Sequence, residues 1–282
     1  MAESVLPSLA DRVFIVTGGG RGIGRQFTRT LVAAGARVVI TAARNADQLE
    51  DAVAEAEALA GAGRVVGVMA DAADADSGER TLDATLKAFG RVDGLVNNAG
   101  RGLNEIRTDP TKAEPPPFWE APADKWTGVI DINVKGPYYM ARAVTPHLIA
   151  AGWGRIINIS TSTQTMIRKA YSPYGPSKAA LEAMTRIWAQ DLAGTGVTVH
   201  ALLPGGATDT SFVPEINGVK KGADGNLLPA DIMNDALLWL LSTDSDGITG
   251  ARVIGRHWDS SLPARDAFAK ARDDKGTLPA IL

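Results

Sequence analysis

Short apolar runs alternate with longer, more polar segments along most of the chain. Runs of this length are typical of strands buried on both faces, and the segments between them are long enough to form helices. Strands are predicted at residues 13–16, 38–41, 64–70, 92–97, 155–160, 198–203 and 251–254. Helices are predicted at residues 26–34, 46–60, 78–89, 126–150, 173–192 and 232–242, with an irregularity at Pro137.

This alternation predicts a parallel sheet with helices on both faces, because parallel neighbours must be joined by a crossover that is usually helical. Right-handed crossovers then produce a doubly wound α/β fold. A chain of 282 residues is long enough to form one such domain with a substantial core. We therefore predict a single α/β domain at residues 1–258 and a polar C-terminal extension at residues 259–282.

Two segments rich in proline or glycine interrupt the alternation, at residues 101–124 and 211–229. Each follows a predicted strand, so each should lie at the carboxyl edge of the sheet, where open α/β sheets bind ligands. We expect both loops to line or cover a site, and a surface insertion without such a role is the alternative. Their side chains Phe118, Trp119 and Phe212 are candidates for an apolar wall, or for anchors of the loops.

The composition narrows the class of protein. The formal net charge of −3 gives no reason to expect a nucleic-acid partner, and the absence of cysteine excludes disulfides and thiolate chemistry. Neither a signal peptide nor an apolar run of membrane-spanning length is visible, so a soluble cytoplasmic protein is expected. The three histidines lack the spacing of metal ligands, and no metal site is expected.

A glycine-rich segment, TGGGRGIG at residues 17–24, joins the first predicted strand to the first predicted helix. Glycine permits a tight turn and a close approach of the backbone, and a helix N-terminus offers free N–H groups to a pyrophosphate. The spacing is G-x-x-x-G-x-G and not the more familiar G-x-G-x-x-G. Dinucleotide binding is predicted here, with candidate contacts at Gly18, Gly20, Arg21, Gly22, Ile23 and Gly24.

The turn resembles the cofactor signature of the short-chain dehydrogenases/reductases, and four further motifs follow in that family's order. They are NNAG at residues 97–100, Asn133 within IDINV, YGPSK at residues 174–178 and PG at residues 204–205. The resemblance extends from residue 12 to about residue 256. It implies a Rossmann-type sheet and hydride transfer between a nicotinamide cofactor and a small carbonyl or alcohol substrate.

The YxxxK motif carries the proposed proton chemistry. Tyr174 and Lys178 are four residues apart on a predicted helix and therefore share a face. A nearby ammonium should lower the pKa of the phenol, so that it can exchange a proton with the substrate oxygen. The resemblance implies that Lys178 also holds the nicotinamide ribose. Ser172 is predicted to cap this helix, with Pro173 as its first residue.

The third member of the catalytic group departs from the family pattern. Family members place a serine 13 residues before the tyrosine, and this chain has Thr161 there, flanked by Ser160 and Ser162. A threonine hydroxyl can donate the same hydrogen bond to a substrate oxygen, so Thr161 is predicted for the role, with Ser162 as the alternative. The resemblance implies that Asn133 holds, through its backbone, a water linked to the lysine.

The residues at the end of the second predicted strand indicate whether the cofactor is NAD or NADP. NAD enzymes usually have an acidic residue there to bind the ribose hydroxyls, and this chain has Ala42, with no carboxylate before Asp47. Arg21 and Arg44 offer positive charge to a 2′-phosphate, so NADP is predicted and NAD is the alternative. The resemblance adds further candidate cofactor contacts at Asp71, Ala72, Asn98, Ala99, Gly100, Pro204, Gly205, Ala207 and Thr208.

The sequence therefore predicts a metal-independent, NADP-preferring alcohol dehydrogenase or ketoreductase. A non-catalytic NADP(H)-binding regulator and an epimerase or lyase on the same fold are the alternatives. Relatives usually pair helices corresponding to residues 126–150 and 173–192, so a homodimer or homotetramer is expected. The substrate itself is not predicted, since specificity would lie in the irregular loops.

Overall fold

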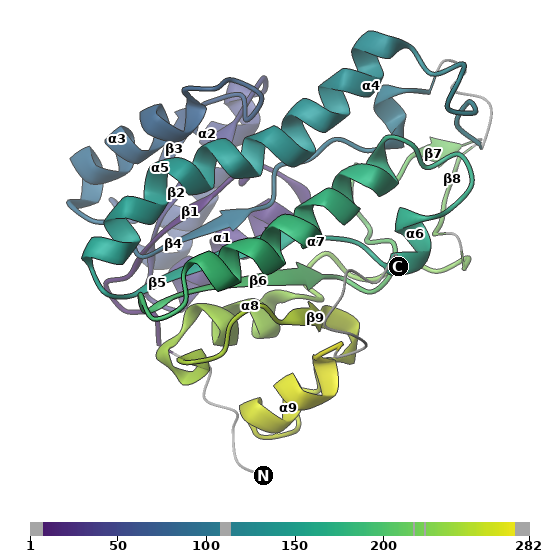
Figure 1. Ribbon diagram of the computed structural model, residues 1–282. Helices are drawn as coiled ribbons and strands as arrows, with labels where there is room; N and C mark the ends of the chain where they lie inside the picture. Colours follow the sequence, from purple (N-terminus) through teal and green to yellow (C-terminus); the bar gives the residue numbers. More distant parts are fainter. Residues whose placement is uncertain (1–7, 108–113, 217, 223, 274–282) are drawn as a thin grey trace.

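A parallel sheet of seven strands runs through the described part of the chain, which comprises residues 8–107, 114–216, 218–222 and 224–273 of a computed structural model. The strand order is β3-β2-β1-β4-β5-β6-β9, so the chain reverses direction across the sheet between β1 and β4 (Figure 1). The strands are β1 Val13–Val16, β2 Arg37–Ala42, β3 Val65–Met69, β4 Gly94–Asn97, β5 Gly154–Ile159, β6 Val197–Leu203 and β9 Arg252–Ile254.

Helices cover both faces of this sheet, as the contacts between elements show. On one face lie α1 Gly22–Ala33, α2 Ala46–Ala60 and α8 Asn234–Leu241. On the other lie α3 Ser77–Phe89, α5 Gly136–Ala150 and α7 Tyr174–Asp191. This arrangement confirms the predicted doubly wound, Rossmann-type α/β fold.

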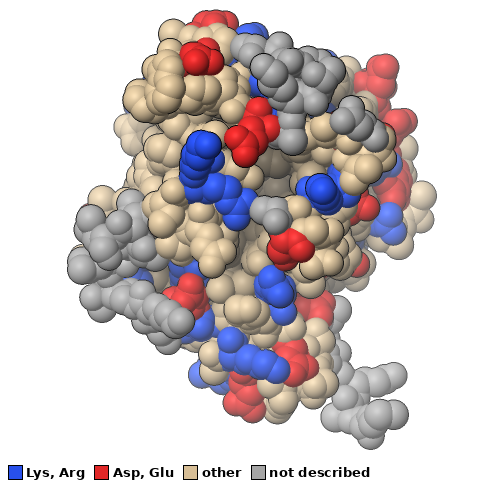
Figure 2. Space-filling view, turned by 90° about the vertical axis from the view of Figure 1, so that its right-hand side faces the viewer, with Lys and Arg blue, Asp and Glu red and all other residues tan. Residues whose placement is uncertain are grey.

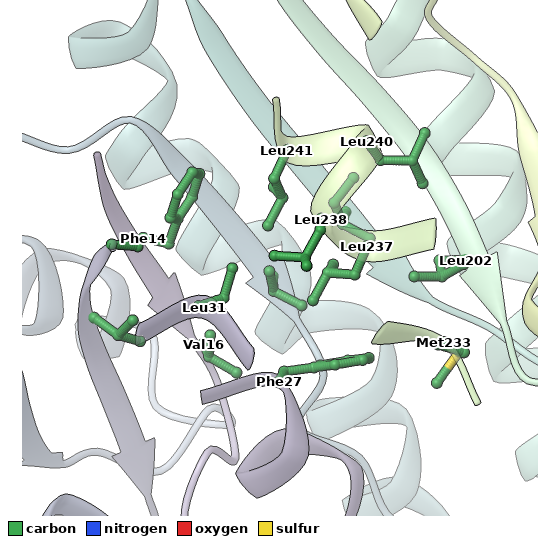
Figure 3. Packing of buried hydrophobic residues seen from close by; sticks show 14 of the residues in the cluster. Phe14, Val16, Phe27, Leu31, Leu202, Met233, Leu237, Leu238, Leu240 and Leu241 are labelled. Carbon is green, nitrogen blue, oxygen red and sulfur yellow. The ribbon is translucent and has the colours of Figure 1, made fainter. Parts of the chain in front are cut away.

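The central strands are mostly apolar because both of their faces are covered. Every residue of β1, β4, β5 and β6 is buried. Between the sheet and its helices, Leu237 and Leu238 of α8 point toward Phe27 and Leu31 of α1 (Figure 3). Met233, just before α8, belongs to the same buried cluster.

The long helix predicted at residues 126–150 is interrupted. The structure has α4 at Ala123–Ile130, a π-helical turn at Asp131–Lys135 and then α5. Pro137 lies in the first turn of α5, where its missing N–H is least costly. The predicted irregularity is therefore present, but it lies in the residues just before the proline.

The two loops contain more regular structure than predicted. Residues 211–229 include a short antiparallel pair, β7 Glu215–Ile216 and β8 Val219–Lys220, and residues 101–124 include a 3₁₀ turn, Leu103–Glu105. A short helix, α6 Thr163–Met166, follows β5. Residues 108–113, 217 and 223, which belong to these loops, lie outside the described residues.

The predicted C-terminal extension contains a helix that the sequence analysis did not identify. This helix, α9 Ala264–Ala271, buries Ala267, Phe268 and Ala271. The Phe268 ring stacks on Trp239 of α8, with 4.6 Å between ring centroids. Residues 272 and 273 then run beside β9, through a bridge between Val253 and Arg272. Residues 274–282 lie outside the described residues.

Among the described helices, none combines the length and the apolar composition that crossing a bilayer requires.

Replacing Phe268 with alanine is expected to lower the free energy of unfolding by about 3 kcal/mol, because it removes a buried ring and leaves a cavity against Trp239. Urea denaturation followed by tryptophan fluorescence measures the change. The control is Leu59→Ala, at a helix position that is 53% exposed, where the change should stay within about 0.5 kcal/mol. Equal, small changes in both variants would show that α9 does not contribute to the core.

Candidate active site

The motif residues gather at the carboxyl edge of the sheet, where β1, β4, β5 and β6 end side by side. Figure 2 shows the molecule from this side. The surface is hollowed near its centre, and Lys and Arg side chains lie on both sides of the hollow (Figure 2). The turn between β1 and α1 and the first turn of α7 both open onto this edge (Figure 1).

The glycine turn is packed so closely that parts of it have no room for a side chain. Gly18 has a φ of +66°, and a Cβ added at Gly24 would lie 2.2 Å from the carbonyl oxygen of Gly18. The N-terminus of α1 has neither a side-chain cap nor an acidic residue in its first turn. Free N–H groups at the positive end of a helix dipole suit a pyrophosphate, so the residues present fit a dinucleotide. The predicted contacts all lie in this turn: Gly18, Gly20, Arg21, Gly22, Ile23 and Gly24.

Thr17 joins this turn to the end of β4. Its hydroxyl accepts hydrogen bonds from the backbone N–H groups of Asn98 (3.0 Å) and Ala99 (2.9 Å). The Asn98 side chain donates in return to the carbonyl oxygens of Thr17 (2.8 Å) and Gly18 (3.2 Å). The sequence analysis did not assign Thr17 a role. A hydroxyl at the end of an otherwise apolar strand was the signal that could have identified it.

Two exposed arginines follow the ends of β1 and β2. Arg21 precedes α1 and Arg44 follows β2, and neither forms an ion pair in the described part of the chain. Ala42 ends β2, and Asp47 lies in the first turn of α2.

Asp71 and Ala72 directly follow the end of β3. The Asp71 carboxylate accepts a hydrogen bond from the backbone N–H of Ala73 (3.0 Å), and Ala72 packs against Gly136 at the start of α5.

The segment after β6 is held from two sides. Arg256 donates from its backbone N–H to the Pro204 carbonyl (3.0 Å) and from its side chain to the Gly205 carbonyl (3.1 Å). Leu228 donates to the Ala207 carbonyl, and Thr208 forms a parallel bridge with Leu228. Thr208 is buried in this pairing.

A later threonine in this segment, Thr210, packs against the glycine turn. Its Cβ lies 3.4 Å from the position that a Cβ on Gly22 would take. Thr210 is therefore the threonine of this segment that the structure brings to the turn.

The start of α7 differs from the prediction by one residue. Its first residue is Tyr174, and Pro173 occupies the cap position without a side-chain hydrogen bond. Ser172 does not cap the helix, because its hydroxyl accepts a hydrogen bond from the Trp126 indole (3.2 Å).

Asn133 ties the π-helical turn to the first turn of α7. Its side-chain nitrogen donates to the Arg101 carbonyl and to the Ser177 hydroxyl, at 2.9 Å each, and its oxygen accepts from the Arg101 N–H (2.8 Å). The Ser177 hydroxyl donates in turn to the Tyr174 carbonyl (2.7 Å). A π-helical turn interrupts the regular backbone hydrogen bonds of the α-helix, and such turns occur often at functional sites. Ser177 is a second residue to which the sequence analysis gave no role.

Lys178 is buried beside Gly100 and Asn133. Its ammonium donates to the carbonyl of Ile159, the last residue of β5 (2.8 Å). Burial lowers the pKa of Lys178 to about 8, and the negative charge of Glu182, one helical turn further on, opposes that shift. An ammonium held in a poorly solvated place interacts strongly with nearby charge.

Tyr174 lies between Thr161 and the ring of Phe212. Burial raises the pKa of Tyr174 to about 12, and the hydrogen bond from the Thr161 side chain opposes this rise. The expected lowering of the phenol pKa by Lys178 is thus absent, because the ammonium is directed to the Ile159 carbonyl and desolvation outweighs the interaction with Thr161. The Phe212 ring centroid is 5.7 Å from that of Tyr174.

Thr161 and Ser162 have different surroundings. The Ser162 hydroxyl caps α6, where it accepts from the Thr165 N–H (3.2 Å) and lies 2.9 Å from the Thr165 hydroxyl. Thr161 contacts Tyr174 through its side chain. Of the two hydroxyls considered from the sequence, Thr161 is the one that the structure brings to the phenol.

Comparisons with known proteins agree with this arrangement. The family model for short chain dehydrogenases matches residues 12–220. A short-chain type dehydrogenase/reductase from Picea abies is 35% identical over 209 residues, which are 72% of this chain and 74% of the relative. A solved dehydrogenase/reductase from Sinorhizobium meliloti 1021 has a TM-score of 0.75 at 30% identity and covers 89% of this chain and 96% of its own. A 3-ketoacyl-(acyl-carrier-protein) reductase from Brucella melitensis, solved in complex with NADH, has a TM-score of 0.73 at 27% identity and covers 87% and 96%.

The fold, with its glycine turn at the strand edge, is that of a nicotinamide-dependent oxidoreductase. Because the family model matches well over half of the chain, the protein belongs to the short-chain dehydrogenase/reductase family.

Proposed function

We propose that this protein reduces ketones, and oxidises the corresponding secondary alcohols, with NADP(H) as its cofactor. The bound nicotinamide would supply or accept the hydride. The protein's own part is to hold the carbonyl, to move the proton on its oxygen and to exclude water. No metal ion is needed in this scheme, because the hydroxyls of Thr161 and Tyr174 can both donate hydrogen bonds to the carbonyl oxygen.

One observation carries this proposal: the Tyr174 phenol lies beside the Thr161 side chain, close enough for the two to interact, at the same sheet edge as the glycine turn. Two O–H groups directed at one oxygen stabilise the negative charge that develops when a carbonyl is reduced. A protein that only binds the nucleotide has no need of this pair.

The pKa of the phenol supports proton donation in the reductive direction. With a pKa of about 12, Tyr174 is protonated at neutral pH and can give its proton to the nascent alkoxide. Lys178, whose ammonium is charged below its pKa of about 8, then stabilises the phenolate that remains. Asn133 and Ser177 support this chemistry by holding the first turn of α7 in place.

The preference for NADP rests on charge. A 2′-phosphate is a dianion or monoanion that favours guanidinium partners, and Arg21 and Arg44 are exposed at the adenosine side without ion pairs among the described residues. The Brucella melitensis relative was solved with NADH, so NAD is the alternative that binding measurements must decide.

The substrate is expected to present an apolar group to Phe212. This ring covers Tyr174 and lies so close to Gly102 that a Cβ there would be 2.6 Å from it. Phe118 and Trp119, from the other loop, are 67% and 71% exposed and contact each other edge to face. An apolar lining on both loops favours a ketone with a hydrocarbon substituent.

Self-association is also part of the proposal. On the face formed by α5 and α7, the large apolar side chains Tyr138, Ile149 and Ile187 are 43–53% exposed. Exposed apolar side chains on two neighbouring helices suit pairing with a second copy of the chain.

Replacing Tyr174 with phenylalanine is expected to lower turnover by two or more orders of magnitude, because the ring remains but the proton donor is lost. The assay is a panel of ketones, including ethyl acetoacetate, with NADPH oxidation followed by absorbance. NADPH affinity, measured by fluorescence titration, should change little. Tyr138→Phe, on the exposed side of α5, is the control and should keep full turnover. Near-normal turnover of the Tyr174 variant would refute the assignment.

The rate of ketone reduction should depend on pH through Lys178. kcat/KM, which reports groups of the free enzyme, should be constant around neutrality and fall above about pH 8 as the lysine loses its charge. Tyr174 stays protonated over this range, so it does not cause the fall. In Lys178→Arg, the guanidinium keeps its charge and the descending limb should disappear. If kcat/KM of this variant still falls near pH 8, a group other than Lys178 causes the fall.

Replacing Arg21 or Arg44 with alanine is expected to weaken NADPH binding by about tenfold for each residue, while NADH binding changes little, because only NADPH carries the 2′-phosphate. Calorimetric titration with each cofactor measures both affinities. Arg25→Ala is the matched control, since that arginine is already paired with Glu55. Wild-type protein that binds NADH at least as tightly as NADPH would overturn the NADP preference.

A further inference from the structure

A buried arginine at the edge of the sheet reaches the backbone of the catalytic segment. Arg252 on β9 donates from one terminal nitrogen to the carbonyl oxygen of Thr161, at 2.9 Å. From these contacts we infer that Arg252 is a positioning residue for the reaction, acting through Thr161. The inference rests on the function proposed above, in which the Thr161 hydroxyl orients the substrate oxygen.

Arg252 is itself fixed by two carboxylates from distant parts of the chain. Its Nε donates to both oxygens of Glu182 on α7, at 3.0 Å each. Its other terminal nitrogen donates to Asp273, which follows α9, at 2.5 Å. The three acceptors thus come from the segment after β5, from α7 and from the C-terminal segment, and one guanidinium joins all three.

The burial of this group leaves it little freedom. The Arg252 side chain is 13% exposed and that of Glu182 is 9% exposed. A charge in such a place must keep its partners, because losing them leaves an uncompensated ion. A guanidinium is planar and has five donors in a fixed arrangement. Its hydrogen bonds to Glu182 and Asp273 therefore also fix the direction of its hydrogen bond to the Thr161 carbonyl.

Glu182 ties this group to the catalytic helix as well. It lies one turn after Lys178 on α7, and its charge acts on the pKa of that lysine. Its carboxylate also accepts a hydrogen bond from the Ser160 hydroxyl (2.6 Å), the residue just before Thr161. The Glu182–Arg252 ion pair therefore holds two neighbouring residues, Ser160 by its side-chain hydroxyl and Thr161 by its carbonyl oxygen.

Positioning matters because the Thr161 hydroxyl must meet both the phenol and the substrate oxygen. Its place is set by the backbone that leaves β5, and displacements of about 1 Å can reduce rates by up to about 100-fold. The Arg252 contact holds that backbone by its carbonyl, so losing it should lower kcat more than it affects cofactor binding.

The C-terminal segment takes part in this arrangement. The backbone N–H of Asp273 donates to the Arg252 carbonyl (2.8 Å), in addition to the contact between their side chains. The packing of α9 on Trp239 places this segment, so the end of the described chain supports the catalytic threonine from outside the sheet.

The test is a double-mutant cycle with Arg252→Lys and Thr161→Ala, using NADPH and ethyl acetoacetate, or the panel ketone that is reduced fastest. Lysine keeps the charge, but its donors all sit on one nitrogen, so it cannot reach acceptors that the three separate nitrogens of the planar guanidinium reach. Alone, Arg252→Lys should lower kcat by about tenfold and leave KM for NADPH within about twofold of the wild-type value. In the Thr161→Ala background, it should change kcat by less than about twofold, because the group it positions is gone.

Asp273→Asn provides a milder variant, since Asp273 is 23% exposed and Arg252 keeps its bonds to Glu182. It should lower kcat by about threefold, again only when Thr161 is present. Arg186→Lys is the matched control, because Arg186 also donates to a backbone carbonyl, that of Gly250, but away from Thr161. That control should leave kcat unchanged.

The outcomes separate the two proposals. If Thr161→Ala retains kcat, the role of Thr161 in the proposed function is wrong, and the inference about Arg252 falls with it. If Thr161→Ala loses kcat but Arg252→Lys and Asp273→Asn do not, only the inference is wrong. If Arg252→Lys lowers kcat equally in both backgrounds, Arg252 has a general structural role, and the inference is also overturned. Should Arg252→Lys not fold, the result with Asp273→Asn decides in the same way.

Discussion

The parallel pairing of β1 with β4, and of β4 with β5, is the constraint on which the site depends. Parallel strands in register end at one edge, so the residues that follow each strand meet there although they are far apart in the chain. The glycine turn after β1, the asparagines after β4 and Thr161 after β5 are brought together in this way. Thr17 then converts this proximity into fixed geometry, because its hydroxyl and carbonyl bind the residues that follow β4.

Desolvation sets the chemical character of the two central side chains. Burial raises the pKa of the Tyr174 phenol and lowers the pKa of the Lys178 ammonium, since in both cases it disfavours the charged form. Tyr174 and Lys178, one turn apart on α7, therefore combine a protonated phenol with an ammonium whose charge is only moderately stable. A partly buried phenol that keeps its proton is suited to donate it, as the proposed reduction of a ketone requires.

Buried charge links the site to the rest of the fold. Lys178 and Arg252 both lie near Glu182, so one carboxylate on α7 faces a cation on each side. Arg252 extends this group to Asp273, and α9 holds that segment against the core. The last described elements of the chain, which contain none of the motifs, are thereby connected to the residues that we propose to meet the substrate. Such an arrangement is costly to desolvate, and it is maintained only if every partner stays in place.

Local patterns in the sequence determined the fold class and the main motifs, because alternating apolar runs and a glycine turn before a helix depend on neighbouring residues alone. They predicted β1 without error and the ends of most other strands to within a residue or two. The motifs, through their resemblance to a family, also predicted roles for Tyr174, Lys178 and Thr161, and these roles stay predictions. The sequence did not reveal α9, whose single apolar face becomes informative only when Trp239 lies opposite it. Nor did it predict the raised pKa of Tyr174, or the contacts of Thr17, Ser177 and Arg252. This pKa and these contacts depend on residues far apart in the chain and on the exclusion of water. Both conditions are set only by the tertiary structure.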